Sequence, residues 1–516
     1  MQSHREIGGG ARFLARCSER QIGNSLGMSR IIRERYGVKI KTSSKWIATS
    51  IALTSTLVSP LLFQEAQAAS SNVTLNLMVG GSEFEKGQFA YNEVQAFEKA
   101  HPNIQVNIHY VNSNFNTAFS ALASSHQLPD VFQPPGPMSL QEALGNHWVQ
   151  PLNSRYYLHN PEFPKGSFQP GVTMENGKIY SFPRQFVGGD ILEYNKTVMK
   201  EAGLNPSKPP TTWAQLMSMS EQVSKKLPGK YGLFLSLNNA FSWGITTAFA
   251  STLMPTMDGS GLDYRTGLYD TGSAAVRKAV QFIINLKQDG ALDPSSVSGS
   301  LPQALGAFAN NQVAFTITGL WGPEDQQLQY GGSANYGVAP IPVAQAGQKP
   351  HQLEPSTTTS FFISSETKHY QASMQLVEWL SSPQYYMAQM KQGMLLPPNA
   401  MVLLKHGYKF PTPQLQQEAE VYAKQSVYEP NIYASPGTAM AAQIEATFPP
   451  QTVLPWQILD GAVGGQDPNW QSQLERSAIL SNQTLGKAIA QAEKAGAKVS
   501  LKNFQFPHWN GMTSYK

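Results

Sequence analysis

The sequence contains little cysteine and little charge. Cys17 is its one cysteine among 516 residues, and 14% of the residues are charged. One cysteine excludes an intrachain disulfide, a Cys-x-x-Cys redox pair and a cysteine-based zinc finger. Because 41% of the residues are hydrophobic, the chain is neither a disordered tail nor a membrane-embedded transporter. Its length corresponds to about two to four domains.

Long apolar runs are absent apart from residues 47–63, IATSIALTSTLVSPLLF. This run follows the basic residues between Arg30 and Lys45 and precedes Ala66-Gln67-Ala68. That order is typical of a secretory signal peptide, with cleavage expected after Ala68. An uncleaved membrane anchor is the alternative, but the run is shorter than the roughly 20 residues that a span needs, and it contains Pro60. We expect Met28 to be the true start, behind an upstream extension.

Removal of residues 1–68 changes the charge balance. They hold 10 of the 38 Lys and Arg residues and 4 of the 34 Asp and Glu residues, which leaves 28 against 30. No basic stripe remains, so we predict no nucleic-acid partner. Cys17 leaves too, and no cysteine remains to carry a lipoprotein anchor. We therefore expect an exported protein, extracellular or in the cell envelope, which is the periplasmic space if the host has an outer membrane. The low charge content also suggests acidic surroundings.

Short β-type runs alternate with amphipathic helical stretches after the signal. Residues 73–79 alternate apolar and polar side chains, a helix is expected at about 87–100, and residues 104–110 alternate again. This order predicts a βαβ unit of an α/β fold with mainly parallel strands. Ligands of such sheets bind beyond the carboxyl ends of the strands, which indicates the loop at 80–83.

Later segments continue this alternation. A helix is expected over 212–226, capped by Thr211 or Thr212, and a strand over 313–317. Residues 343–359 are rich in turn formers and predict a loop, and the chain is expected to be mostly helical from Gln414 onward.

Motifs of catalysis and metal binding are absent. The sequence has no HExxH, GxSxG, P-loop or GxGxxG motif, and its ten histidines are scattered singly. Residues 258–263 indicate a plain turn rather than a calcium loop. We expect no catalytic residue, metal or cofactor. A secreted carbohydrate-active hydrolase, or a non-catalytic glycan-binding module, remains the alternative, because the two carboxylates of a glycosidase carry no sequence motif.

Residues 176–216, NGKIYSFPRQFVGGDILEYNKTVMKEAGLNPSKPPTTWAQL, resemble the bacterial extracellular solute-binding proteins of the sugar-binding type (family 1). The pattern of that family is G-K-x-Y-x-x-P, a strand ending in Y-N-K, a helix ending in A-G, and P-x-T-W-x-E-L, where this chain ends in AQL. Other blocks match in the same order: FEKAHPNIQV (97–106), LPDVF (128–132), AFANNQVAFTITGLW (307–321), YGVAPIP (336–342), WLSSPQ (379–384) and GMLLPPN (393–399). The similarity covers nearly all of the exported chain, and the C-terminal part is enlarged.

The resemblance implies a two-lobe, periplasmic-binding-protein-like α/β fold (type II) whose lobes are joined by crossing strands at a hinge. It implies a monomer that catches a carbohydrate, a mono- or oligosaccharide, between its lobes and delivers it to the permease subunits of an ABC-type sugar importer. By this analogy the first lobe comprises 69–183 and 356–405. The second lobe comprises 184–355 and a helical C-terminal part, 406–516.

A sugar cleft needs flat aromatic rings and planar polar groups, because sugars present apolar CH faces and a rim of hydroxyls. Trp321 directly follows Thr318-Gly319-Leu320, where the family places a tryptophan that packs on the ligand; a core tryptophan is the alternative. The flanking Gly319 and Gly322 place it in a loop at the end of a strand and favour the cleft. Asn239 and Trp243 lie in a stretch, 238–243, expected to form a similar loop. Trp243 serves equally well as a packing residue.

Further candidates follow the first strand and the expected hinge. Ser82 and Glu83 offer backbone N–H groups and a carboxylate, although Glu83 could instead cap the next helix. Arg184 and Gln185 follow Phe182-Pro183. The Arg184 guanidinium would donate to hydroxyls or to a carboxylate in the cleft, or else lie on the surface. Asp130 is a candidate too, with a structural turn favoured. Some family members have an aromatic residue after the Pro-Asp block, but this chain has Gln133-Pro134-Pro135 there.

Overall fold

The computed structural model describes residues 72–111, 114–135, 138–164, 166–186, 188–330, 335–355, 357–449 and 453–515. These residues belong to one compact unit of the chain. The signal peptide and upstream extension predicted over 1–68 lie outside the described residues, as does Met28.

The first lobe contains the predicted βαβ unit. β1 and β2 pair in parallel over their whole length, Val73 opposite Ile104 and Val79 opposite Tyr110. The helix α2 joins them and buries Phe89, Val94 and Phe97 against the sheet, because these side chains share one face of the helix. The predicted unit is confirmed. The elements of this lobe are β1 (Val73–Val79), η1 (Ser82–Phe84), α2 (Phe89–Ala100), β2 (Ile104–Tyr110), α3 (Phe115–Ser124), β3 (Val131–Phe132), α4 (Leu140–Gly145), β4 (Val149–Gln150), α5 (Ser154–His159), β5 (Met174–Glu175), β6 (Lys178–Ile179), β14 (Phe362–Ser364), α12 (Tyr370–Trp379) and α13 (Pro383–Lys391).

The sheet of this lobe has the strand order β2-β1-β3-β14-β4. β1 runs parallel to β2 and β3, whereas β14 is antiparallel to both of its neighbours. β14 comes more than 200 residues after β3 and β4. The chain therefore leaves this lobe and later returns to complete its sheet.

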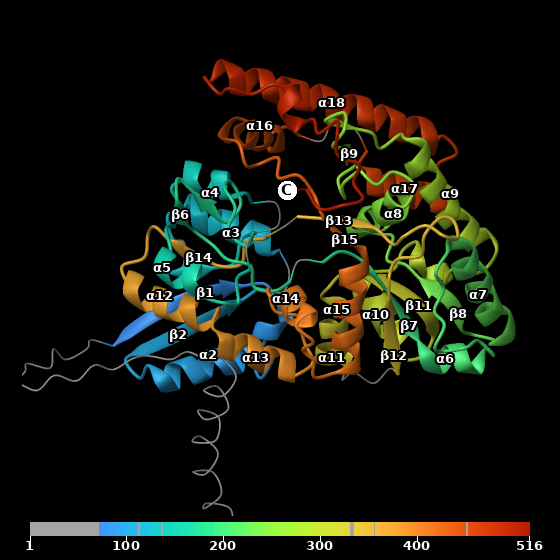
Figure 1. Cartoon of the computed structure of the whole chain (residues 1–516), viewed down its shortest axis with the longest axis horizontal. Coiled ribbons are helices and arrows are strands. Elements are labelled where there is room, and N and C mark those ends of the chain that lie inside the picture. The colour runs from blue at the N-terminus through green and yellow to red at the C-terminus, as the bar shows by residue number, and fades with distance from the viewer. Residues whose placement is uncertain are drawn as a thin grey trace, which may run out of the picture. The chain divides into compact units, whose positions relative to one another are not determined.

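The second lobe is built around a sheet with the order β12-β7-β11-β8, in which β7 is antiparallel to β12 and β11. The side chain of Thr212 accepts the Gln215 N–H and caps α7, as predicted. The two-lobe α/β fold expected from the sequence is what the structure has (Figure 1). The elements of this lobe are β7 (Ile191–Asn195), α6 (Lys196–Glu201), α7 (Trp213–Lys226), β8 (Tyr231–Phe234), α8 (Phe241–Ser251), β9 (Leu262–Asp263), β10 (Leu268–Tyr269), α9 (Ala274–Gln288), η2 (Pro294–Ser296), α10 (Leu301–Ala309), β11 (Val313–Thr318), α11 (Gly322–Tyr330), β12 (Tyr336–Ala339) and α15 (Pro413–Gln425). α14 (Ala400–Lys405) ends the returning segment and contacts α15.

Crossing segments link the two lobes. The Ser181 hydroxyl donates to the Phe361 carbonyl and accepts the Ser360 N–H, which ties the outgoing segment to the returning one. β13 (Gln352–Glu354) pairs in parallel with β15 (Ser426–Tyr428). The prediction of a loop over 343–359 was therefore wrong at β13, whose strand partner lies more than 70 residues away and leaves no local pattern.

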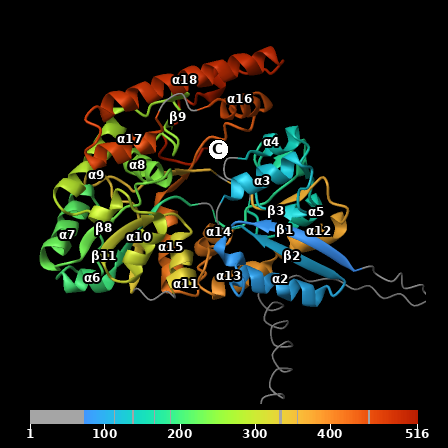
Figure 2. The same cartoon turned by 180° about the vertical axis from the view of Figure 1, so that it is seen from behind.

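The C-terminal part is mostly helical, as predicted, with α16 (Pro436–Ala446), α17 (Pro455–Gly464), α18 (Trp470–Lys494) and η3 (Leu501–Phe504). α17 packs on α8 and α9 of the second lobe, whereas α16 packs on α18 and also contacts α4 of the first lobe. Figures 1 and 2 show α18, in red, extending from above α17 to above α16. The C-terminal part therefore contacts both lobes. Among the described residues, no helix has the length and apolarity that crossing a membrane requires.

Gly189 lets a crossing segment approach β13 closely. A Cβ atom at this position would collide with the carboxyl of Glu354 and the amide of Gln352, and both side chains are buried and have little room to move. We expect Gly189→Ala to lower the free energy of unfolding by about 1–3 kcal/mol. Gly259→Ala is the matched control, because no heavy atom lies near its added Cβ. Equal urea midpoints for the two variants would contradict this packing.

Candidate functional site

A cavity of about 330 Å³ lies where the crossing segments meet both lobes. Gln133 comes from the first lobe at the end of β3, and Trp321 comes from the second lobe. Arg184, Gln185 and residues 358–360 come from the crossing segments. The structure thus brings three of the predicted site residues together, namely Trp321, Arg184 and Gln185.

Trp321 lies in the loop between β11 and α11, as the sequence predicted. Its side chain is half-buried and its ring meets the ring of Phe241 edge-on at 5.4 Å. Gly319 makes room for the ring, because a Cβ there would lie 2.7 Å from the Trp321 Nε1 atom. The indole is therefore fixed on one side and open to the cavity on the other, which suits stacking on an apolar face of a solute.

Arg184 is the cation of this region. It forms an ion pair with Glu83, whose side chain is 6% exposed, and its Nη2 donates to Gln185 Oε1 at 3.0 Å. Glu324, at the start of α11, is buried close by; burial raises its pKa to about 7, and the charge of Arg184 opposes the rise. Arg184 thus lies between a carboxyl of the first lobe and one of the second. Glu83 pairs with Arg184 and is therefore more than a cap of the next helix, which was the alternative considered from the sequence.

Ser82 lies at a contact between the lobes. Its hydroxyl donates to Asp325 Oδ1 on α11 at 3.3 Å, so the loop after β1 meets the second lobe directly.

Asp130, Asn239 and Trp243 lie elsewhere. Asp130 accepts the Asn76 N–H at 2.8 Å, the structural role that the sequence favoured. Asn239 accepts the Phe241 N–H at the start of α8, and Trp243 is 7% exposed in the core of the second lobe. The expected loop around Trp243 was wrong, because this residue is inside α8. None of the three belongs to the walls described for the cavities next to the crossing segments.

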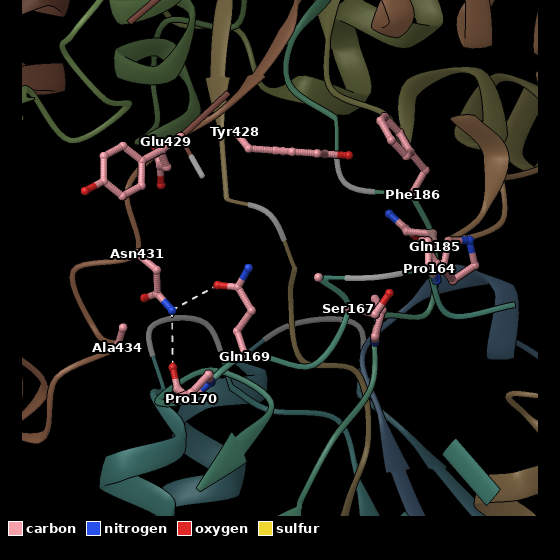
Figure 3. Close-up of a pocket in the computed structure, with 14 residues that line it drawn as sticks. Pro164, Ser167, Gln169, Pro170, Gln185, Phe186, Tyr428, Glu429, Asn431 and Ala434 are labelled. Atoms are coloured by element: carbon pink, nitrogen blue, oxygen red, sulfur yellow. Dashed lines mark hydrogen bonds between the residues drawn. The ribbon is translucent and has the colours of Figure 1, made fainter. Parts of the chain in front are cut away.

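A larger cavity, of about 620 Å³, adjoins the same crossing segment and shares Gln185 and Phe186 as lining residues. Figure 3 shows Tyr428 and Phe186 on one side of it and Gln169 and Pro170 on the other. The Asn431 amide donates to Gln169 Oε1 at 3.0 Å and to the Pro170 carbonyl at 3.2 Å. Of these lining residues, Gln185 alone was predicted from the sequence.

The C-terminal tail forms part of the wall of the larger cavity. Tyr515 lines it, and the Tyr515 N–H donates to the Tyr428 carbonyl at 2.8 Å. The Tyr428 N–H in turn donates to the Ser514 hydroxyl at 3.0 Å. The end of the described chain is therefore held against β15.

Buried carboxyl groups are concentrated around these segments. Burial raises the pKa of Asp190 and Glu193 to about 7 and that of Glu429 to about 8. It also raises the pKa of Glu354 and Glu418, and neighbouring carboxylates add to the rise. Among the described residues, no group of three or more His, Cys, Asp or Glu side chains has an arrangement that could hold a metal ion.

The raised pKa values predict how stability depends on pH. A carboxyl whose pKa is higher in the folded than in the unfolded state binds more protons when folded, so its contribution to stability is complete below about pH 4 and is lost as the pH rises to about 7 or 8. We expect the melting temperature to fall between about pH 5 and pH 9, and Glu193→Gln to make this fall smaller, because the neutral amide no longer titrates. The exposed Glu85→Gln variant should keep the wild-type slope. A melting temperature that rises over this interval would contradict the prediction.

The Arg184 ion pair generates a second prediction. Arg184→Met leaves Glu83 buried without its cation, so we expect unfolding to become easier by about 3 kcal/mol. Adding Glu83→Gln to this variant should restore part of the loss, since no unpaired charge remains. Lys230→Met, which breaks the exposed pair with Glu201, should cost less than about 1 kcal/mol. Chemical denaturation of the four proteins measures these differences, and equal losses for the two single variants would be inconsistent with a buried pair.

Comparisons with known proteins agree with this architecture. The family model described as "Bacterial extracellular solute-binding protein" matches residues 81–387, which is more than half of the chain. The sn-glycerol-3-phosphate-binding periplasmic protein of Rhizobium meliloti is 22% identical over 355 residues, 64% of this chain and 75% of that protein. An uncharacterised ABC transporter extracellular-binding protein of Pyrococcus horikoshii is 20% identical over 256 residues, 48% of this chain and 55% of that protein.

Solved structures share the fold. The GacH receptor of Streptomyces glaucescens, solved unliganded and with acarbose, has a TM-score of 0.59 and 20% identity, covering 81% of this chain and 99% of that one. A solute-binding protein of Thermotoga lettingae bound with alpha-D-tagatose has a TM-score of 0.62 and 18% identity, covering 80% and 100%. With the match of the family model over both lobes, these findings establish that the chain is a member of the bacterial extracellular solute-binding protein family.

Proposed function

We propose that this protein captures a neutral carbohydrate between its lobes and delivers it to an ABC-type importer. The observation that carries the proposal is the wall of the smaller cavity, which combines the Trp321 ring with amide and hydroxyl side chains. An aromatic face and planar amides match the apolar faces and hydroxyl rims of a sugar. Trp321, Arg184, Gln185 and, at the lobe contact, Ser82 and Glu83 are the proposed site residues.

The charge of the site favours a neutral solute over an anionic one. Arg184 is the cation in the walls of the two cavities as described, and Glu83 already neutralises it. A phosphate ester would bring a negative charge into these cavities, where the one cation of the described walls is already paired. The glycerol phosphate named for the Rhizobium relative is therefore a less suitable solute here than an uncharged sugar.

The proposed role involves no bond making or breaking. The family is described as binding proteins, and several proteins of similar fold were solved with sugars, including maltose and raffinose. We propose an exported monomer, held outside the membrane without a lipid anchor, whose closed form is recognised by permease subunits. Sustained release of reducing ends from a glycan would instead favour the secreted hydrolase. The lobe bounds expected from the sequence, 69–183 with 356–405 and 184–355 with 406–516, belong to this proposal.

A ligand screen tests the solute class. A solute at 100 times its Kd stabilises the folded state by about 2.7 kcal/mol, so a binding sugar should raise the melting temperature measurably. The panel contains D-tagatose, maltose, maltotriose, raffinose and sn-glycerol 3-phosphate. We expect a shift with at least one neutral sugar and none with the phosphate ester. A shift with sn-glycerol 3-phosphate alone would overturn the carbohydrate assignment.

Trp321 provides a residue-level test. Trp321→Ala should weaken sugar binding by about 2 kcal/mol or more, a factor of about 30, because the ring loses its contact with the solute. Its folding should remain cooperative, since the ring is half-buried. Trp243→Ala is the matched control: this ring is in the core, and its removal should cost about 3–5 kcal/mol of folding stability. Calorimetric titration and urea unfolding of both variants separate the two roles, and unchanged sugar affinity in Trp321→Ala would exclude stacking on this ring.

A further inference from the structure

Glu429 is the acidic side chain in the wall of the larger cavity. Apart from Glu429, the lining contains prolines, aromatic rings and neutral polar groups, with no Lys, Arg or His among the described residues. Figure 3 places Glu429 beside Tyr428, across the cavity from Gln169 and Pro170. A carboxyl group in this wall would contact a solute that extends from the smaller cavity, past the shared lining residues Gln185 and Phe186, into the larger one.

The surroundings of Glu429 hold its carboxyl in the neutral form. The ionisable groups that face it are Asp258 and Tyr264 near β9, Glu354 on β13 and Tyr433 farther along its own segment. Burial and the charge of Asp258 raise the pKa of Glu429 to about 8, and the hydrogen bond with Tyr264 opposes part of this rise. None of these neighbours is a cation, so the hydrogen bond with Tyr264 alone favours the ionised form, and burial outweighs it.

The backbone around Glu429 is fixed on both sides. Its N–H donates to the Glu354 carbonyl at 2.9 Å, which extends the pairing of β15 with β13. Two residues later, the Asn431 amide is bound to Gln169 and Pro170 of the first lobe. Glu429 therefore belongs to a segment that contacts both lobes, and hydrogen bonds on both sides of this residue fix its backbone.

We propose that Glu429 is a specificity-determining residue that donates a hydrogen bond from its protonated carboxyl to an oxygen of a neutral, hydroxyl-rich solute. This inference rests on the proposed function and deepens it. A neutral carboxyl has one O–H donor, whereas the ionised form is an acceptor only. Ionisation therefore removes the donor and places a buried negative charge beside the solute, so that binding weakens and anionic solutes are rejected.

The test is calorimetric titration of the purified chain with D-tagatose, maltotriose and raffinose between about pH 6 and pH 9. Above its pKa the protonated fraction of a carboxyl falls about tenfold per pH unit, so the wild-type affinity should fall by about tenfold between pH 6 and pH 9. Glu429→Gln keeps a donor that does not titrate, so its affinity should stay within about threefold of wild type at pH 6 and should not fall at pH 9. Melting curves at each pH confirm that every protein compared is folded.

Glu445→Gln is the matched control variant. Burial raises the pKa of Glu445 to about 7, but this residue is on α16 and does not line the cavity, so the variant should keep the wild-type loss of affinity. A wild-type affinity that does not change with pH would overturn the role of Glu429 while leaving sugar binding intact. So would a loss that persists in Glu429→Gln. If Glu429→Gln does not fold, a wild-type affinity that is the same at pH 6 and at pH 9 still overturns the role of Glu429. No binding of any of these sugars by the wild-type protein at pH 6 would overturn the proposed function itself.

Discussion

The segments that link the lobes are packed around carboxyl groups that have no cation beside them. Asp190, Glu354 and Glu429 belong to different crossing or adjoining segments. The charges of Asp190 and Glu429 both raise the pKa of Glu354, and burial raises the pKa of all three. Such groups can be buried because they are neutral, in which state they hydrogen-bond much as amides do. Ionised, they would repel one another at the point on which the arrangement of both lobes depends. The close approach of Gly189 to Glu354 makes the packing between these two residues tight.

Arg184 is the exception to this pattern, and its position explains why. It pairs with Glu83 after β1, and its charge also acts on Glu324 at the start of α11. A guanidinium keeps its charge at any pH at which the protein folds, so this contact between the lobes does not depend on protonation in the way that the neutral carboxyls do. The segments that link the lobes thus combine the Arg184–Glu83 ion pair with several carboxyls whose pKa is raised by burial. The acidic surroundings suggested by the low charge content of the sequence stay a prediction, and in such surroundings these carboxyls would be neutral.

The sequence predicted what local patterns determine. Alternation over 73–79 and 104–110 and the helical face between them predicted β1, α2 and β2, and the glycines on either side of Trp321 predicted its loop. The larger cavity was missed because its walls come from distant segments without a motif. Tyr428 and Asn431 lie within the region predicted as mostly helical, where the short strand β15 pairs with β13. Trp243 was assigned to a loop comparable to that of Trp321, but Ser242, Thr246 and Ala248 continue a helix whose tertiary packing outweighs weak local propensity.

The enlarged C-terminal part bears on how the lobes can separate. Opening the cavities would break the Ser82–Asp325 hydrogen bond, the Asn431 bonds to Gln169 and Pro170, and the contact between α16 and α4. Exposed hydrogen bonds of this kind contribute about 1 kcal/mol each, so the separation is a small change in free energy compared with unfolding of either core. A solute that contacts both lobes shifts the equilibrium between the open and closed forms by the difference in its affinity for them. If the empty protein were tightly closed, the solute could not enter easily, and its apparent affinity would be lower. The contacts of the C-terminal part with the first lobe stabilise the closed form. The free energy of solute binding therefore adds to a closed form that these contacts already favour.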